Sequence, residues 1–467
     1  MTVRVYDSRL QAEVDFVPLV EGRVGIYVCG PTAQSSPHIG HLRSALVYDL
    51  WRRWLTYRGF DVTLVRNVTD IDDKILASAD GKEPWWALAY RFELEFTAGY
   101  TALGILPPTY EPRATASISE MRDIIQRLID NGHAYAADGD VYFDTASWSA
   151  YGSLTRQKPD ETVAAADSEV RAKRDPRDFA LWKGHKPDEP ADASWPSPWG
   201  AGRPGWHIEC SAMSKRYLGA SFDIHGGGLD LRFPHHENEL AQSTAAGDAF
   251  ATYWVHNGLV NVNNQKMSKS LSNSIFAAEF LQQAPPIVVR YFLGAAHYRS
   301  TIDYHDGSLV EAEAALDRVE VFLARADRRL DSTRFAGSGV EIVPDEFAAA
   351  MDDDLAVPQA LGVLHETVRA GNAALDNGDL RAVADARGAV LAMSEVLGIN
   401  PLSPQWRDAR ASPSEMALTS LVETLIADRN AARAAKDFAA ADRIRDELAA
   451  AGITVEDGAT GSHWSID

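Results

Sequence analysis

The alternation of short apolar runs with amphipathic segments predicts an α/β fold for the first third of the chain. Residues 24–29 form an apolar, β-branched run typical of a buried strand, and residues 41–57 carry apolar side chains at helical spacing. Residues 62–68 predict a second strand. A strand, a helix and a strand within about 45 residues form a βαβ unit, which implies a parallel sheet with a nucleotide site at the carboxyl ends of its strands.

The pattern changes over residues 110–200, which we interpret as an insertion. This segment contains an amphipathic helix over residues 118–131, a short hairpin strand over 141–144 and a stretch rich in proline and tryptophan at 195–200. The α/β pattern resumes at Trp206. We therefore predict a Rossmann-type parallel-sheet domain that carries an insertion.

The remainder of the chain is predicted to be helical. Residues 330–344 and 400–414 hold Ser, Gly, Thr or Pro among few apolar side chains, which is typical of linkers. Residues 347–397 predict an α-helical bundle, and residues 415–451 predict two helices of a small C-terminal domain. The predicted domains are residues 1–304, 305–343, 344–400 and 414–467.

The composition is that of a globular protein. Apolar residues make up 46% of the chain, charged residues 24%, and the formal net charge is −21. The acidic balance argues against non-specific binding of polyanions, although a local basic face can bind nucleic acid within an acidic whole. Because the chain has only 2 cysteines, no N-terminal signal pattern and no long apolar run, we expect a cytoplasmic protein with no membrane partner.

Two histidines follow the first predicted strand and open the first predicted helix. His38 and His41 are three residues apart, and Gly40 between them allows a ligand to approach the backbone closely. The positive end of the helix dipole adds to the attraction of the two imidazoles for an anion. The alternative is a pair of ordinary loop histidines.

Two lysines lie in a polar stretch far downstream. Lys266 and Lys269 in the run Lys-Met-Ser-Lys-Ser can reach the β- and γ-phosphates of a nucleotide as point charges. The alternative is a solvated basic loop. Together and in this order, the histidine and lysine motifs resemble the two signatures of class I aminoacyl-tRNA synthetases.

Both cysteines of the chain lie within clusters of polar chemistry. Cys29 closes the first predicted strand, and Cys210 ends the run Gly-Trp-His-Ile-Glu-Cys. His235 and Glu239 are spaced i, i+4 and are expected on one helix face. Two sulfurs, one nitrogen and one oxygen form a ligand set suited to Zn²⁺. The alternatives are a buried apolar cysteine and a polar helix start.

The whole chain resembles the bacterial cysteinyl-tRNA synthetases. The stretches that carry this resemblance are residues 67–74, 195–210, 222–228, 233–239, 266–271, 296–300 and 351–354, with the tail around 435–438 and 457–458. The resemblance implies ATP-dependent activation of L-cysteine to cysteinyl-adenylate and its transfer to the 3′ end of tRNA(Cys). It also implies Mg²⁺ with ATP, a zinc ion that binds the substrate thiolate, and a monomer.

The resemblance assigns roles to individual residues. His38, Gly40, His41, Lys266 and Lys269 are expected to act on ATP. The residues expected to line the cysteine pocket are Thr69, Trp206, His225 and Asp230; Gly227 is expected beside the adenosine, and Cys29, Cys210, His235 and Glu239 are expected to be the metal ligands. Asp230 can pair with the substrate ammonium, and Trp206 can equally be a core aromatic.

The chain departs from the family pattern at two places. Residues 33–35 read Ala-Gln-Ser where many members carry Val-Tyr-Asp, and Ser272 stands where glycine is usual. The nearest competing function is that of a cysteine ligase of the mycothiol pathway, which couples cysteine to an aminosugar, and the C-terminal segment argues against it. A non-catalytic tRNA-binding protein is disfavoured by the intact histidine and lysine motifs, and a plain nucleotidyltransferase is disfavoured by the predicted zinc ligands.

Overall fold

A computed structural model describes most of the chain. The chain divides into two compact units. The described residues are 2–156, 172–267, 273–331, 341–406, 413–458 and 461–466. The first unit comprises residues 1–284, 289–310 and 345–361, and the second comprises residues 285–288, 311–344 and 362–467.

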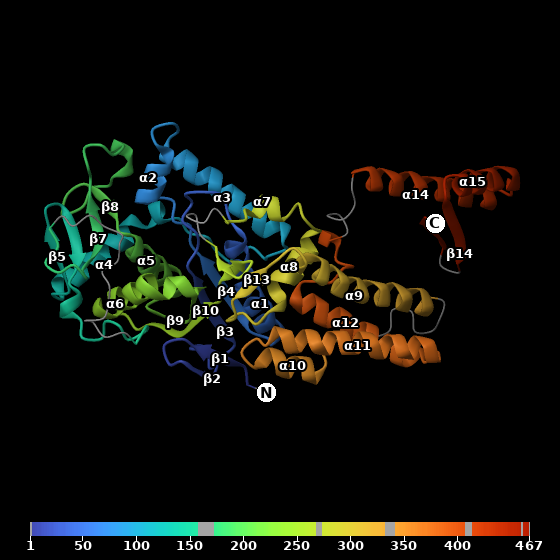
Figure 1. The fold of residues 1–467 in the computed structure, drawn as a ribbon, viewed down its shortest axis with the longest axis horizontal. Helices are drawn as coiled ribbons and strands as arrows, with labels where there is room; N and C mark the ends of the chain where they lie inside the picture. Colours follow the sequence, from blue (N-terminus) through green and yellow to red (C-terminus); the bar gives the residue numbers. More distant parts are fainter. Residues whose placement is uncertain are drawn as a thin grey trace. The chain divides into compact units, whose positions relative to one another are not determined.

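The first unit is built around a parallel four-stranded sheet (Figure 1). Its strands are β3 (Arg23–Val28), β4 (Asp61–Arg66), β9 (Ser221–Gly228) and β10 (Phe250–Asn257), in the order β10-β9-β3-β4. Helix α1 (Ile39–Tyr57) connects β3 to its parallel neighbour β4. The predicted α/β fold class and the βαβ unit are therefore confirmed. The chain places β4 on one side of β3 and then places β9 and β10 on its other side. Sheets of this kind form a crevice at the carboxyl ends of the strands where the order reverses, which here is between β3 and β9.

The insertion folds as a second, antiparallel sheet with helices beside it. Its strands are β5 (Ala134–Ala137), β6 (Asp140–Phe143), β7 (Phe179–Gly184) and β8 (Gly202–Pro204), paired in chain order. The helices that precede it are α2 (Asp73–Ala79), α3 (Trp85–Ala102) and α4 (Ile118–Asp130). The predicted helix over 118–131 and the predicted hairpin strand are confirmed.

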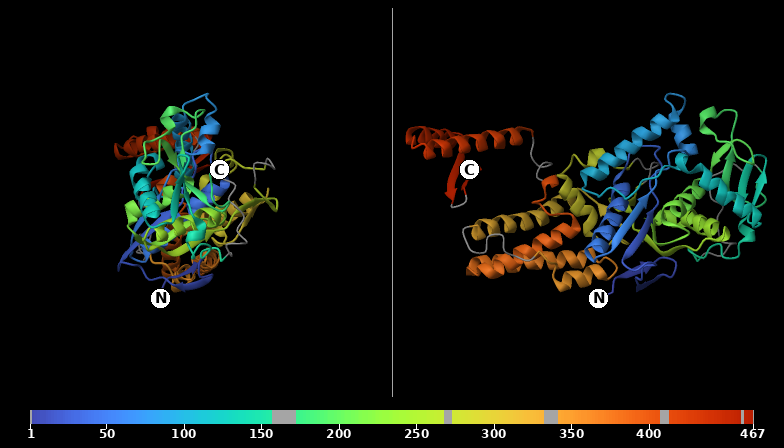
Figure 2. Two further views of the ribbon diagram at one scale, coloured as in Figure 1. Left: turned by 90° about the vertical axis from the view of Figure 1, so that its left-hand side faces the viewer. Right: turned by 180° about the vertical axis from the view of Figure 1, so that it is seen from behind.

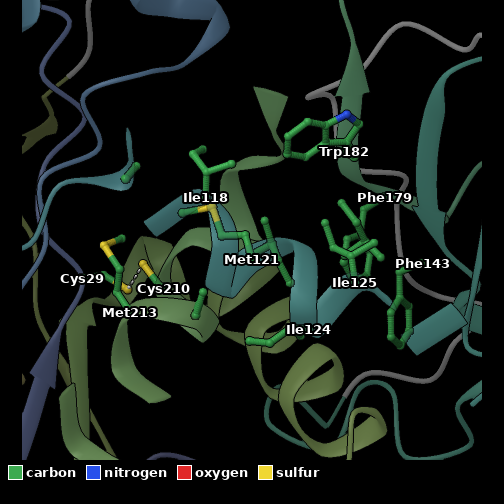
Figure 3. Close-up of a cluster of buried hydrophobic side chains, with 14 of the residues drawn as sticks. Cys29, Ile118, Met121, Ile124, Ile125, Phe143, Phe179, Trp182, Cys210 and Met213 are labelled. Atoms are coloured by element: carbon green, nitrogen blue, oxygen red, sulfur yellow. Dashed lines mark hydrogen bonds between the residues drawn. The ribbon is translucent and has the colours of Figure 1, made fainter. Parts of the chain in front are cut away.

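One apolar core joins the insertion to the parallel-sheet unit (Figure 3). Ile118, Met121, Ile124 and Ile125 of α4 are all buried and face residues of the second sheet and of α5 (Trp206–Leu218). This spacing of three and four residues places their side chains on one stripe of the helix. The core residues drawn with them are Phe143, Phe179, Trp182, Met213, Cys29 and Cys210.

The other short elements of the first unit surround the sheet. They are β1 (Arg4–Asp7), β2 (Ala12–Asp15), a wide helical turn (Arg232–His236), α6 (Glu237–Ala245), β11 (Val260–Val262), β12 (Gln265–Lys266), α7 (Ala277–Phe280), β13 (Ile302–Tyr304) and α10 (Asp345–Asp352). Three helices have residues in both units: α8 (Pro286–Ala295), α9 (Ser308–Leu330) and α11 (Val357–Asn377).

The second unit is almost entirely helical (Figure 2). It contains most of α9 and α11, together with α12 (Leu380–Leu397), α14 (Pro413–Ala434), α15 (Phe438–Ala450), β14 (Ile453–Gly458) and β15 (Gly461–Ile466). The two helices predicted for the tail are confirmed, and the short end after them is a β-hairpin. None of the helices in the described part of the chain has the length and apolar character that a membrane crossing requires.

Candidate active site and metal centre

A cavity of about 360 Å³ opens at the carboxyl ends of β3 and β9. Many of the residues predicted to bind substrate lie in its wall: Cys29, His38, Gly40, His41, Trp206, Asp230 and Lys266. These residues come from segments far apart in sequence, and the parallel sheet brings them together because the loops after its strands meet at one edge.

The two histidines of the first motif cap helix α1. The Nδ1 atom of His38 accepts the backbone N–H of Gly40 at 3.1 Å, and the Nδ1 atom of His41 accepts the backbone N–H of His38 at 3.1 Å. Their rings stack with centroids 3.7 Å apart. Because each Nδ1 is an acceptor, a neutral ring carries its proton on Nε2. The imidazoles are thus held at the positive end of α1.

The first lysine of the second motif lies close to this helix end. Lys266 ends β12 and lines the same cavity, and a methyl group added at Gly40 would lie 3.5 Å from the Cε atom of Met267. The backbone N–H of Ile39 donates to the carbonyl of Ile275 at 3.1 Å, which ties α1 to the chain beyond the lysine motif. Lys269 and Ser272 lie outside the described residues.

The four predicted metal ligands converge on one point. The ligand atoms of Cys29, Cys210, His235 and Glu239 all lie within 4.8 Å of one another, and all four residues are buried. The two Sγ atoms are 3.5 Å apart (Figure 3), and Nε2 of His235 lies 3.0 Å from Oε1 of Glu239. A set of two sulfurs, one nitrogen and one oxygen in this space suits a tetrahedral Zn²⁺ ion.

The prediction that His235 and Glu239 share one helix is wrong in detail. Glu239 lies in α6, which begins at Glu237, whereas His235 lies in the wide turn before it. Phe233 in that turn has an extended backbone, with φ −138° and ψ 135°. The two side chains still meet because the turn runs directly into the helix.

A second group of ligands overlaps the first. Cys29 and Glu239 also lie within 4.8 Å of His225 and His236, which offers a set of one sulfur, two nitrogens and one oxygen. Both sets contain donors that zinc accepts. The first set holds both sulfurs of the chain, and soft thiolate ligands favour zinc over harder cations.

Burial dominates the protonation of this cluster. Burial raises the pKa of Cys29 well above its ordinary value, and the neighbouring Cys210 and Glu239 raise it further. Burial likewise raises the pKa of Cys210 to about 11, with the thiol of Cys29 opposing the shift. The protein alone therefore favours neutral thiols, and a divalent cation among these donors would reverse that preference.

The chain matches sequence models of one family over nearly its whole length. The tRNA synthetases class I (C) catalytic domain matches residues 15–314, the DALR domain matches residues 346–401, and the cysteinyl-tRNA ligase anticodon binding domain matches residues 416–464. A cysteine–tRNA ligase of Leifsonia xyli subsp. xyli is 71% identical over 476 residues, which cover 100% of both chains. A cysteine–tRNA ligase of Clavibacter michiganensis subsp. michiganensis is 70% identical over 482 residues, again with 100% of both chains covered.

The chain belongs to the cysteinyl-tRNA ligase family. The predicted family, and with it the predicted class of enzyme, a ligase that forms aminoacyl-tRNA, are therefore confirmed.

Solved structures of other synthetases share the fold. The methionyl-tRNA synthetase of Mycobacterium tuberculosis in complex with methionyl-adenylate has a TM-score of 0.56 at 15% identity, covering 86% of this chain and 94% of that one. The leucyl enzyme of Agrobacterium radiobacter K84, in a ternary complex, has a TM-score of 0.60 at 11% identity, covering 85% and 86%. At these identities the likeness concerns the fold alone, which is that of class I synthetases.

The remaining residues of the predicted cysteine pocket occupy two layers. Trp206 and Asp230 line the cavity, and the Trp206 ring stacks on His235 with centroids 4.1 Å apart. Thr69 and His225 are buried and are not among the cavity-lining residues. The hydroxyl of Thr69 donates to Glu209 at 2.7 Å, and Nε2 of His225 lies 2.8 Å from Oε2 of Glu239.

Gly227, like Thr69 and His225, is not among the residues that line the cavity. Its carbonyl accepts the hydroxyl of Tyr48 at 3.0 Å, and an added Cβ would lie 2.8 Å from the His236 ring. Of the three glycines 226–228, Gly228 lines the cavity. The end of the triplet therefore brings backbone to the cavity at Gly228, while Gly227 itself is needed for packing; its place beside the adenosine stays a prediction.

Three polar residues that were not predicted from the sequence contact the predicted metal ligands or their neighbours. Oδ1 of Asn67 accepts the N–H of Gly30 at 2.9 Å and lies 3.5 Å from Sγ of Cys210. Nδ1 of His207 lies 2.9 Å from Nδ1 of His235, and Gln242 donates to the His207 carbonyl at 2.9 Å. Such partners orient metal ligands. His207 lies one helical turn before Cys210, which was the available sequence signal.

Replacing Gly30 with alanine is expected to lower the stability of the protein by about 1–3 kcal/mol and to reduce its metal content. The added Cβ would lie 1.6 Å from the carbonyl oxygen of Asn67, so the chain next to Cys29 would have to move. Chemical denaturation and metal analysis measure the two effects. Gly25→Ala on strand β3 is the control, since its added Cβ meets no atom closer than 3.6 Å. Equal behaviour of the two variants would contradict the prediction.

Proposed function

We propose that this chain activates L-cysteine with Mg·ATP and transfers it to the 3′ end of tRNA(Cys), and that a zinc ion recognises the substrate thiolate. The observation that carries this proposal is the double role of Cys29. It belongs to the buried four-ligand set and also lines the cavity that holds the ATP signature. A metal held by Cys29, Cys210, His235 and Glu239 would therefore lie at the wall of the substrate cavity.

Metal binding accounts for the choice of cysteine over serine. The two amino acids differ by one atom, and shape alone discriminates such pairs by only about 1–3 kcal/mol. When bound, zinc supplies a soft Lewis acid that prefers a thiolate to an alcohol. Asn67 and His207 would hold its ligands in place through the contacts described above.

In the first step, a carboxylate oxygen of cysteine forms a bond to the α-phosphorus of ATP. The bond from that phosphorus to the bridging oxygen of the β-phosphate breaks, and pyrophosphate leaves. His38 and His41, fixed at the end of α1, would stabilise the phosphates. Lys266 and Lys269 would neutralise the leaving group. The chemistry needs no protein nucleophile, because positioning and charge stabilisation are sufficient for phosphoryl chemistry of this kind.

In the second step, the terminal ribose hydroxyl of the tRNA attacks the carbonyl carbon of the adenylate, and AMP leaves. In class I enzymes this is generally the 2′-hydroxyl. Asp230 lines the cavity and would pair with the ammonium of the substrate. Trp206 would form the wall beside the cysteine side chain. Three residues behind the cavity wall would support it. Thr69 would hold Glu209 and His225 would hold Glu239, while Gly227 would allow the glycine backbone to pack closely.

We further propose that the enzyme acts as a cytoplasmic monomer and that its C-terminal parts contact the tRNA. The matches to the DALR and anticodon-binding domains support a role in tRNA binding for residues 344–400 and 414–467. The catalytic part would then be residues 1–304, with its insertion at 110–200 and a stem-contacting segment at 305–343.

Transfer of labelled cysteine to acid-precipitable tRNA, run beside an aminosugar–inositol acceptor, tests this function. We expect ATP-dependent charging of tRNA and no transfer to the sugar. Transfer to the sugar alone would contradict the proposal and favour the paralogous cysteine ligase. Adenylate formation alone would not separate the two enzymes, so the acceptor is the deciding variable.

A further inference from the structure

A lysine that no catalytic motif includes lies in the wall of the cavity. Lys74 is exposed, lies in the first turn of α2 and lines the cavity beside Trp206, with its Nζ atom 5.4 Å from the centroid of that ring. No carboxylate among the described residues lies within 4.0 Å of its ammonium. The side chain therefore presents to the cavity a positive charge that forms no ion pair with the described residues.

The backbone around Lys74 is held by a network of charged groups. Asp72 caps α2 by accepting the N–H of Lys74 at 2.9 Å. The carboxylate of Asp73 accepts from Nζ of Lys183 at 2.6 Å and from the guanidinium of Arg203, which also donates to Glu189 at 2.7 Å. Lys183 and Arg203 belong to β7 and β8 of the insertion, which lie beside α2 (Figure 1).

In this group of Asp73, Lys183 and Arg203, which we call the clamp, the carboxylate of Asp73 stays ionised at neutral pH. Burial alone would raise the pKa of Asp73, but Lys183 and Arg203 outweigh it and lower the pKa to about 2. Arg203 is only 2% exposed, so the clamp is shielded from bulk solvent on that side. Its geometry fixes α2 to the insertion and with it the place where the Lys74 side chain leaves the backbone.

Two further cations of the cavity already have a partner or a role. The guanidinium of Arg66 pairs with Glu111 at 2.9 Å and lies over the ring of Tyr100, 4.1 Å from its centroid. Lys266 lies with the histidine motif, where the triphosphate of ATP is expected. In the function proposed above, the charges of cysteine would also be matched, because its thiolate would face the predicted metal ligands, its ammonium would face Asp230 and its carboxylate would react.

The tRNA is the substrate to whose charge this arrangement has assigned no partner among the described residues. Its last nucleotides must enter the cavity for the second step, and they bring phosphodiester groups with them. We propose that Lys74 binds a phosphodiester at the 3′ end of the tRNA in the transfer step, and that the clamp of Asp73, Lys183 and Arg203 positions it. The proposal rests on the function proposed above. Phosphate contacts of this kind fix the register of a nucleic acid rather than read its sequence.

Separate assays of the two steps test the role of Lys74. In Lys74→Met we expect cysteine-dependent pyrophosphate exchange to stay within about twofold of the unmodified enzyme, while single-turnover transfer from the adenylate to tRNA falls by about 10–100-fold, as for a lost charge-assisted hydrogen bond. Lys74→Arg should recover most of the transfer rate. Lys82→Met is the matched control, since Lys82 lies just beyond α2, is exposed and pairs with Asp80.

The salt dependence of tRNA binding gives a readout that a merely structural role would not change. Loss of one phosphate contact should reduce the slope of log K against log salt concentration by about 0.7–1 in Lys74→Met and not in Lys82→Met. Equal losses in exchange and transfer, or no loss in either, would overturn the inference while leaving the proposed function intact. Absence of exchange in the unmodified enzyme would instead refute the proposed function.

A second variant tests the clamp. Asp73→Asn weakens the contacts to Lys183 and Arg203 without touching the cavity wall. We expect a smaller loss, of about 3–10-fold, confined to the same transfer step. In the double variant with Lys74→Met the loss should not exceed that of Lys74→Met alone, because both changes act through one side chain. Additive losses would show that Asp73 does not position Lys74.

Discussion

Cys210→Ala is expected to lose the bound metal and to lower kcat/KM for cysteine by more than about 100-fold, the upper end of what is seen when a supporting residue of a metal site is changed. The sulfur of Cys210 lies 3.5 Å from that of Cys29 and belongs to the ligand set that contains both sulfurs. Metal analysis and steady-state adenylate formation measure the two effects. The cysteine-dependent step should be lost even when ATP still binds.

The controls for this variant separate chemistry from folding. Ser214→Ala changes another buried residue of α5, whose hydroxyl donates to the Ser211 carbonyl at 3.2 Å, and it should keep both metal and activity. Cys210→Ser keeps the shape of the side chain with a slightly smaller atom and should still lose most of the metal, because an alcohol is a poor zinc ligand. Full activity in a Cys210→Ala enzyme that has lost its metal would contradict the account.

His38→Asn is expected to lower the rate of adenylate formation by about 10²–10³-fold, as for other groups that stabilise transition-state charge, with little change in melting temperature. In the structure His38 has two roles, since it lines the cavity and its Nδ1 atom caps α1. Asparagine is a good N-cap residue and can replace the second role but not the first. Pyrophosphate exchange and thermal unfolding separate them.

The alanine variant at the same position completes this test. His38→Ala should lose the same activity and, in addition, about 1 kcal/mol of stability through loss of the cap. If His38→Asn retains full exchange activity, the histidine serves α1 alone and the role assigned to it in catalysis is wrong.

The sequence was sufficient for the central βαβ unit because its elements carry clear local signals. The strand before Cys29 is a continuous apolar run, and helix α1 has apolar side chains at helical spacing and a capping sequence at its start. The antiparallel sheet of the insertion was only partly predicted. Its strands are three to six residues long, β6 and β7 are buried on both faces, and a register shift occurs at Val141 and Tyr142, so no clear alternation marks them.

The structure brings together those predicted site residues that follow a strand or begin a helix. Cys29 and His38 lie at such positions, Lys266 ends a short strand, and the topology brings all three into one cavity. The sequence could not show which residues stand in the wall and which stand one layer behind. Thr69 faces the buried acid Glu209, a contact across 140 residues that no local pattern encodes.

The sequence also could not show that Lys74 lies in the cavity wall. It lies within the conspicuous stretch 67–74, yet its exposure to the cavity depends on the clamp between Asp73 and the insertion. That clamp joins segments 110 and 130 residues apart, so the position of the Lys74 charge could not be predicted from the local sequence.

Adenylate formation with cysteine and with serine, by the enzyme as purified, after metal removal and after addition of zinc, tests the central claim most directly. The account predicts that the metal-free enzyme, shown to be folded by thermal unfolding, binds cysteine more weakly and discriminates far less between the two amino acids. Zinc should restore both properties. Unchanged discrimination in a folded, metal-free enzyme would contradict the claim that a metal held by Cys29, Cys210, His235 and Glu239 selects the substrate.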